Sequence, residues 1–203
     1  QLAVHAMGQN SIDMAVNLIA GEEDWLDDRL PHARIEHASM PTENALAKSA
    51  AADIAFVTQP VFLYAEIERY VENLGLAWLQ TTFPFKEILH RGIRLAFSTD
   101  APATPLADAT DPFLCLETAV TRKGGDGTDC GRENAVDLET ALKLYTREGA
   151  YVMGFTDIGM LKKGYRADFV VLDRDIFNVP GNQIHQVRVE ETYMDGELRY
   201  RRE

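Results

Sequence analysis

The chain has 203 residues, of which 46% are hydrophobic and 26% charged, a composition typical of a globular domain. Its formal net charge of −12 excludes the clustered positive charge that nucleic-acid and anionic-lipid surfaces require. No apolar run is long enough to span a bilayer, and the two cysteines do not make a disulfide framework. We therefore expect a cytoplasmic protein that binds neither nucleic acid nor membrane.

Short apolar runs alternate with helical periodicities over the first 155 residues. In chain order, we predict a buried strand at 2–5, a helix at 11–20 capped by Ser11, a strand at 33–37, a helix at 41–52, a strand at 54–58, a helix at 84–90, a strand at 93–97, a helix at 112–122 and a long helix at 137–153 capped by Asp137. The acidic stretch 22–28 is expected to be a solvated face or loop, and the glycine-rich stretch 123–134 a mobile loop. The long insertion at 64–82 is expected to shape a pocket.

The pattern changes after residue 155, where strands dominate. Residues 169–172 form a predicted strand, and residues 187–201 a predicted hairpin around Asp195-Gly196, a pair typical of type I′ turns. We therefore divide the chain into residues 1–155 and a β-rich segment at 156–203.

Alternating strands and helices are typical of an α/β fold with a parallel sheet and helices packed outside it. His37 follows His5 by 32 residues, and Asp100 follows His37 by 63, or two units near 32. On average this approaches the ~31 residues per unit of a (β/α)8 barrel. The spacing predicts half of such a barrel. A half barrel leaves two sheet edges open. We therefore expect a part of a longer protein, or a homodimer that closes the half barrel.

His5, His37 and Asp100 each stand at the C-terminal end of a predicted strand. In a barrel these ends converge on the face where active sites are built. Two imidazoles and a carboxylate are a donor set for a divalent metal, most commonly zinc. A bound metal would activate water, and a carboxylate beside it would move the proton. The pattern by itself leaves a structural role for each histidine open.

Two further polar residues are candidates with competing roles. Gln59 ends the third predicted strand, where it would contact substrate or cap the strand end. Arg122 ends a predicted helix, and we expect it to stabilise the C-terminus of that helix.

Three segments resemble motifs of the metal-dependent amidohydrolase superfamily: 4–8 (VHAMG), 34–38 (RIEHA) and 97–102 (FSTDAP). Further matches lie at 58–60 (TQP), 119–122 (AVTR) and 159–173 (GMLKKGYRADFVVLD). The resemblance is greatest to the branch that contains N-substituted formamide deformylase. It covers nearly the whole chain, with the motifs in the same order.

The resemblance implies that His5 and His37, on the fifth and sixth barrel strands, bind the metal. Asp100, on the eighth, would be a metal ligand and the general base. It further implies hydrolysis of C–N bonds in small amide-like substrates, and a small β-sandwich domain that begins near residue 156.

Two departures from the family pattern bear on the metal. The superfamily's His-x-His pair and its metal-bridging lysine are missing from these residues, and Gln9 stands where the branch has an aspartate. The alternative function is therefore a non-catalytic scaffold, a half-barrel module that dimerises.

Overall fold

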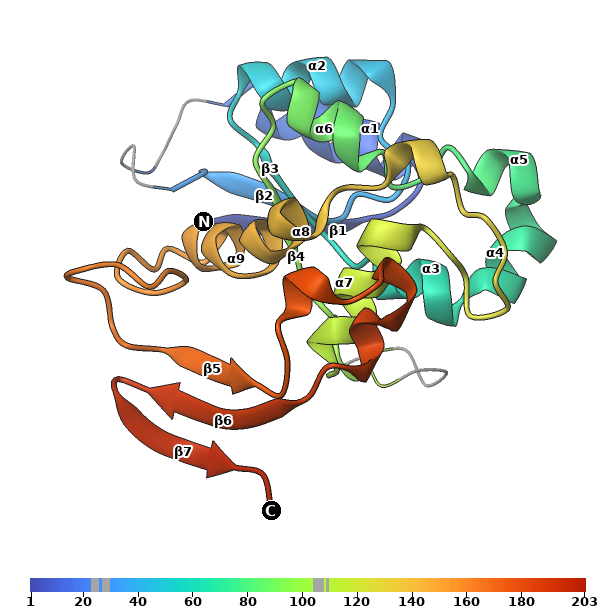
Figure 1. Cartoon of the computed structure of the whole chain (residues 1–203). Coiled ribbons are helices and arrows are strands. Elements are labelled where there is room, and N and C mark those ends of the chain that lie inside the picture. The colour runs from blue at the N-terminus through green and yellow to red at the C-terminus, as the bar shows by residue number, and fades with distance from the viewer. Residues whose placement is uncertain (23–25, 27–29, 104–107, 109) are drawn as a thin grey trace.

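The computed structural model describes residues 1–22, 26, 30–103, 108 and 110–203, so most of the acidic stretch lies outside the described residues. Within them, four parallel strands form one sheet in the order β1-β2-β3-β4 (Figure 1). Their bounds are β1 Leu2–Ala6, β2 Ala33–His37, β3 Ala55–Thr58 and β4 Leu95–Phe97. The sheet confirms the predicted parallel α/β arrangement.

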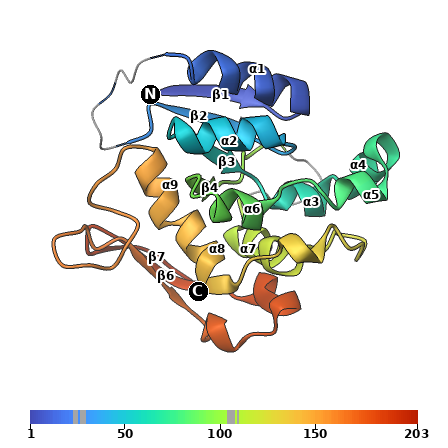
Figure 2. The same ribbon diagram turned by 90° about the horizontal axis from the view of Figure 1, so that it is seen from above.

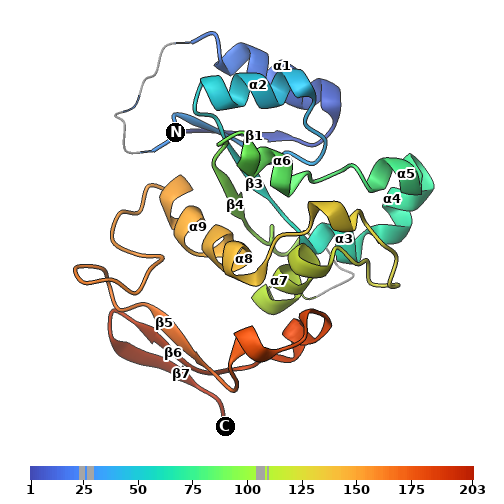
Figure 3. The same cartoon turned by 45° about the horizontal axis from the view of Figure 1, so that its top comes forward.

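The helices have the bounds α1 Gln9–Ile19, α2 Glu43–Ala51, α3 Val61–Ala65, α4 Ile67–Leu74, α5 Leu76–Leu79, α6 Phe85–His90, α7 Pro112–Thr121, α8 Leu138–Tyr145 and α9 Arg147–Val152. Helices α1, α2 and α6 lie on one face of the sheet, and α9 lies on the other (Figure 3). Val152 of α9 packs there against Ala55, Val57 and Ala96. Helices therefore cover both faces, whereas the barrel expectation places them outside only, and the half barrel stays a prediction.

Strand β1 is exposed, which corrects the expectation of a buried strand. Leu2 is 43% exposed and the side chain of His5 is also exposed, while all four residues of β3 are buried. The reason is position, since β1 pairs with β2 on one side and has no strand partner on the other among the described residues. A short apolar run fits an edge strand as well as a central one.

The predicted helix caps are confirmed at one site and wrong at another. The Asp137 carboxylate accepts a hydrogen bond from the backbone N–H of Thr140 at 2.7 Å, as an N-cap does. Ser11 instead lies inside α1, where its hydroxyl donates to the carbonyl of Gly8 at 2.9 Å. The predicted long helix is also interrupted, since Thr146 (φ −109°, ψ −75°) separates α8 from α9.

The stretch 123–134, expected to be a mobile loop, is hydrogen-bonded to the body of the protein. The backbone N–H of Gly125 donates to the carbonyl of Tyr64 at 3.0 Å, and Cys130 is fully buried. Gly131 has φ +91° and passes so close to the chain that a Cβ there would lie 2.1 Å from the carbonyl oxygen of Gln80. This approach requires glycine.

Arg122 does more than end α7. Its guanidinium is fully buried and donates hydrogen bonds to the carbonyls of Thr82, Phe83, Cys130 and Gly131, at 2.6–3.2 Å. Burial lowers the pKa of Arg122 to about 10, so the side chain stays charged at neutral pH. It joins the turn after α5 to the loop after α7.

The C-terminal segment forms a second, antiparallel sheet in the order β5-β6-β7. The bounds are β5 Phe169–Leu172, β6 Val189–Met194 and β7 Glu197–Arg201, and short 3-10 turns span Ile176–Asn178 and Gly181–Gln186. Asp195 and Gly196 both have positive φ (53° and 76°), which confirms the predicted tight hairpin. Figure 2 shows this sheet beyond α8, on the side away from β1. No helix among the described residues could cross a membrane.

Candidate metal centre

The C-terminal ends of β1 and β2 bring His5 and His37 together. Their ring centroids lie 4.4 Å apart and the ring planes make an angle of 73°. His37 is 6% exposed, whereas His5 lies at the open edge of the sheet and is exposed. Two of the three predicted ligands are therefore in contact.

This contact departs from the regular strand pattern. Register pairs His5 with Glu36, so strict alternation would point His37 to the opposite face. His37 instead has φ 73° and the following Ala38 has φ 44°. Left-handed backbone at non-glycine residues costs on the order of 1–3 kcal/mol and persists where the surrounding structure holds it, often at functional sites. We attribute the contact between the imidazoles to this break in the pleat.

Gln59 fixes the ring of His37. It is 1% exposed, its Oε1 lies 2.8 Å from His37 Nδ1, and its Nε2 donates to the hydroxyl of Ser98 at 2.8 Å. Because an amide oxygen can only accept, Nδ1 of a neutral His37 carries the proton. The lone pair of Nε2 is then available to a metal, as in other metal-binding histidines. Contact between Gln59 and a substrate stays a prediction.

Asp100 lies beyond the end of β4 and is exposed, with φ 52°. Over the described part of the chain, no group of three or more His, Cys, Asp or Glu side chains is close enough to hold a metal ion. The histidine pair thus fits part of a metal site, because it offers two imidazole nitrogens, one of them oriented by Gln59. A complete shell needs further donors, and the role of Asp100 as a ligand stays a prediction.

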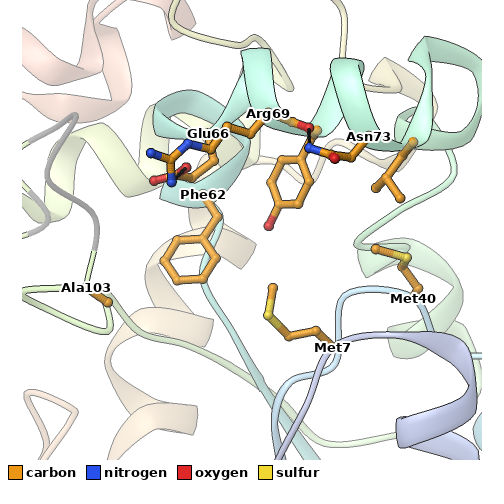
Figure 4. A pocket seen from close by; sticks show the side chains of 9 residues that line it. Met7, Met40, Phe62, Glu66, Arg69, Asn73 and Ala103 are labelled. Carbon is orange, nitrogen blue, oxygen red and sulfur yellow. Dashed lines mark hydrogen bonds and ion pairs between the residues drawn. The ribbon is translucent and has the colours of Figure 1, made fainter.

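A hollow of about 430 Å³ lies between α4 and the loops that carry Met7 and Met40 (Figure 4). We call it the α4 pocket, and its walls include Met7, Met40, Phe62, Arg69, Tyr70 and Leu74. Phe62 stacks on His37, with ring centroids 5.8 Å apart. Residues of α4 line the hollow, as expected for the insertion at 64–82. Met7 was not predicted as a site residue, although its place two residues after His5 is a usable signal.

Comparison with known proteins matches a family model described as the amidohydrolase family to residues 1–200. The chain is 29% identical over 204 residues to the Bacillus subtilis protein named amidohydrolase YtcJ. The aligned region covers 98% of this chain and 37% of that protein. The chain is also 29% identical over 206 residues to N-substituted formamide deformylase of Arthrobacter pascens, covering 99% and 36%. The chain spans little more than a third of the length of these curated relatives.

Solved structures of metal-dependent hydrolases are also similar to the chain. An uncharacterized metal-dependent hydrolase from Pyrococcus horikoshii superposes with a TM-score of 0.72 at 30% identity, over 88% of this chain and 35% of that one. Atrazine chlorohydrolase from Arthrobacter aurescens, solved with zinc, superposes with a TM-score of 0.62 over 98% of this chain and 43% of that one. Its 19% identity shows a shared fold alone.

Proposed function

The chain belongs to the amidohydrolase family, and from this premise we propose that it forms part of the active site of a metal-dependent hydrolase. The reaction is the cleavage of C–N bonds in small amide-like molecules. The observation that carries the proposal is the contact between His5 and His37, whose ring centroids lie 4.4 Å apart at the ends of neighbouring strands. Nδ1 of His37 is held by the side chain of Gln59.

His5 and His37 would hold the ion, with Asp100 as a third ligand and further ligands from residues outside these 203. Zinc is the divalent metal that best matches two imidazoles and a carboxylate. When bound, such an ion lowers the pKa of a coordinated water to about 7 and polarises the carbonyl of the substrate.

The residues of the chain have separate tasks. Asp100 takes a proton from the attacking water and delivers it to the leaving nitrogen, so the amide yields an acid and an amine. Gln59 keeps Nδ1–H of His37 pointing away from the metal. Phe62, stacked on His37, limits the access of water to that ring.

The first experiment measures zinc binding by equilibrium dialysis and elemental analysis. His37→Ala is expected to weaken zinc binding by at least about tenfold, because it removes an oriented ligand. His90→Ala, at the end of α6, is the matched control and should bind like the wild type. Equal binding by all three proteins would overturn the metal site.

The second experiment tests Asp100 in the full-length protein. Asp100→Asn keeps a side chain of the same size but cannot accept the proton. We expect turnover of amide substrates to be abolished while most of the metal stays bound. Turnover near the wild-type rate would remove Asp100 from the mechanism.

A non-catalytic dimerising module is the second candidate. It is favoured by the open edge of β1 and by the lack of a three-donor cluster in the described residues. Sedimentation at increasing protein concentration discriminates the two, because a dimer that forms without bound metal favours the module.

A further inference from the structure

Three hydrogen-bonded side chains connect the ends of three neighbouring strands. His37 ends β2, Gln59 follows β3 and Ser98 follows β4, and these strands are neighbours in the sheet in that order. Gln59 Oε1 lies 2.8 Å from His37 Nδ1, and Gln59 Nε2 donates to the hydroxyl of Ser98 at 2.8 Å. Ser98 is therefore the last member of a hydrogen-bonded chain that begins at a proposed metal ligand.

Backbone hydrogen bonds hold Gln59 and Ser98 in place. The N–H of Ser98 donates to the carbonyl of Thr58 at 2.9 Å, and the carbonyl of Ser98 accepts from the thiol of Cys115 at 3.9 Å. The carbonyl of Gln59 accepts from the N–H of Phe62 at 3.0 Å. Because Gln59 is only 1% exposed, solvent has little access to its amide group. The partners of this amide are therefore the two side chains beside it.

A glutamine between a hydroxyl and an imidazole can adopt two orientations, because both neighbours can donate or accept. In the observed orientation the amide oxygen faces His37, which requires the proton on Nδ1 and leaves Nε2 free to bind a metal. In the reverse orientation the NH2 group faces Nδ1, so the proton occupies Nε2, the nitrogen that would bind the metal. The orientation of Gln59 therefore decides whether His37 is prepared as a ligand.

Ser98 bears on this choice because its hydroxyl accepts from the NH2 group in the observed orientation. Without the hydroxyl, the observed orientation leaves buried N–H groups of Gln59 without a partner, whereas the reverse orientation leaves a carbonyl oxygen. Buried N–H groups without a partner are rarer in proteins than buried carbonyl oxygens with spare capacity. Loss of the hydroxyl should therefore shift Gln59 toward the reverse orientation.

We propose that Ser98 is a positioning residue for the metal centre: by accepting from Gln59, it selects the Nδ1–H form of His37 and so raises the affinity for the metal. The metal rests on the proposed function. The preference for one tautomer of His37 rests on the two hydrogen bonds alone. Because Asp100 follows Ser98 by two residues, the end of β4 carries both the proposed general base and this positioning residue.

The first test measures the tautomer of His37 in the metal-free protein by 15N NMR, at about pH 8.5, where an ordinary imidazole is neutral. Protonated and unprotonated ring nitrogens give separate signals, and His37→Ala assigns those of His37. We expect the Nδ1–H form to predominate in the wild type and the Nε2–H form to gain population in Ser98→Ala. Ser98→Thr keeps the hydroxyl and should behave like the wild type.

Ser49→Ala is the matched control. The hydroxyl of Ser49 in α2 is buried, but it forms no hydrogen bond within the described part of the chain. The substitution therefore removes the same atom as Ser98→Ala without removing a hydrogen bond, and it should leave the signals of His37 unchanged. Equal tautomer populations in the wild type, Ser98→Ala and Ser49→Ala would overturn the proposal.

The second test is a double-mutant cycle on zinc affinity with Gln59→Glu. A carboxylate accepts from Nδ1–H of His37 in either orientation and has no N–H to leave unpaired. Ser98→Ala should weaken zinc binding by about fivefold in the wild-type background, which corresponds to one neutral hydrogen bond. In the Gln59→Glu background it should weaken zinc binding by less than about twofold. Equal losses in both backgrounds would mean that Ser98 does not act through Gln59, and would overturn the proposal.

The positioning role and the proposed function can fail separately. If the wild type binds no zinc, the metal site is wrong, and the tautomer of His37 in the metal-free protein still decides the role of Ser98. If zinc binding depends on His37 but not on Ser98, the metal site stands and the positioning role is wrong.

Discussion

The two sheets of this protein are stabilised in different ways. All four residues of β3 are buried, because helices cover both faces of the parallel sheet. No residue of β5, β6 or β7 is fully buried, and Val170 and Val171, on opposite faces of β5, are 48% and 41% exposed. The parallel sheet is stabilised by burial on both faces. The antiparallel sheet is stabilised by its own strand pairing and by a few side chains, such as Leu172 and Val189, that pack against the main core.

The polar contacts follow the same division. In the helical region, Arg122 lies fully buried among backbone carbonyls. In the small sheet, Arg201 reaches Glu191 at 2.9 Å with 64% of its side chain exposed. Exposed ion pairs contribute only about 0–1 kcal/mol. Arginine is therefore structural in one region and nearly neutral for stability in the other.

The largest effect is expected from Arg122→Met. The substitution leaves several buried carbonyls without a donor, so we expect the free energy of unfolding to fall by about 3 kcal/mol or more. Arg201→Met, the matched change in the small sheet, should cost less than about 1 kcal/mol. Urea unfolding followed by circular dichroism measures both. Equal losses of stability in the two variants would contradict this difference between the two sheets.

An intermediate effect is expected from Gln59→Leu, which bears on function. Without the acceptor at Nδ1, the ring of His37 is no longer oriented, so zinc affinity should fall by about tenfold or more. Arg199→Gln in β7 should leave zinc affinity unchanged, because the small sheet contributes no ligand to the proposed centre. Parallel losses in the two variants would mean that zinc binds elsewhere.

The smallest effect concerns Asp173, which directly follows β5. A hydrogen bond from Arg174 and one from the backbone N–H of Arg188 lower the pKa of Asp173 to about 2. The charged form is therefore favoured in the folded state, so its stabilisation is complete above about pH 4 and is lost as the pH falls toward 2. In Asp173→Asn, the free energy of unfolding should lack this decrease between about pH 4 and pH 2. An identical pH profile of the urea midpoint in both proteins would contradict it.

Features decided within a few residues could be predicted from the sequence. The strands at 33–37 and 54–58, the Asp137 cap and the Asp195-Gly196 turn all follow from local hydrogen bonds and backbone preferences. The positions of His5 and His37 at strand ends could be predicted for the same reason, because strand periodicity is local.

Other features depend on which segments pack together. The exposure of β1, the burial of Arg122 and the contact of the two imidazoles involve partners far away in the chain. The left-handed backbone of His37 breaks the alternation from which its direction would be inferred.

The order of the elements and the residues available for metal chemistry could therefore be predicted before the fold was known. The open edge of β1, the packing of α9 against β3 and β4 and the stacking of Phe62 on His37 instead depend on contacts between distant segments. Backbone preferences act over a few residues, whereas burial and side-chain orientation depend on neighbours that only the folded chain brings together.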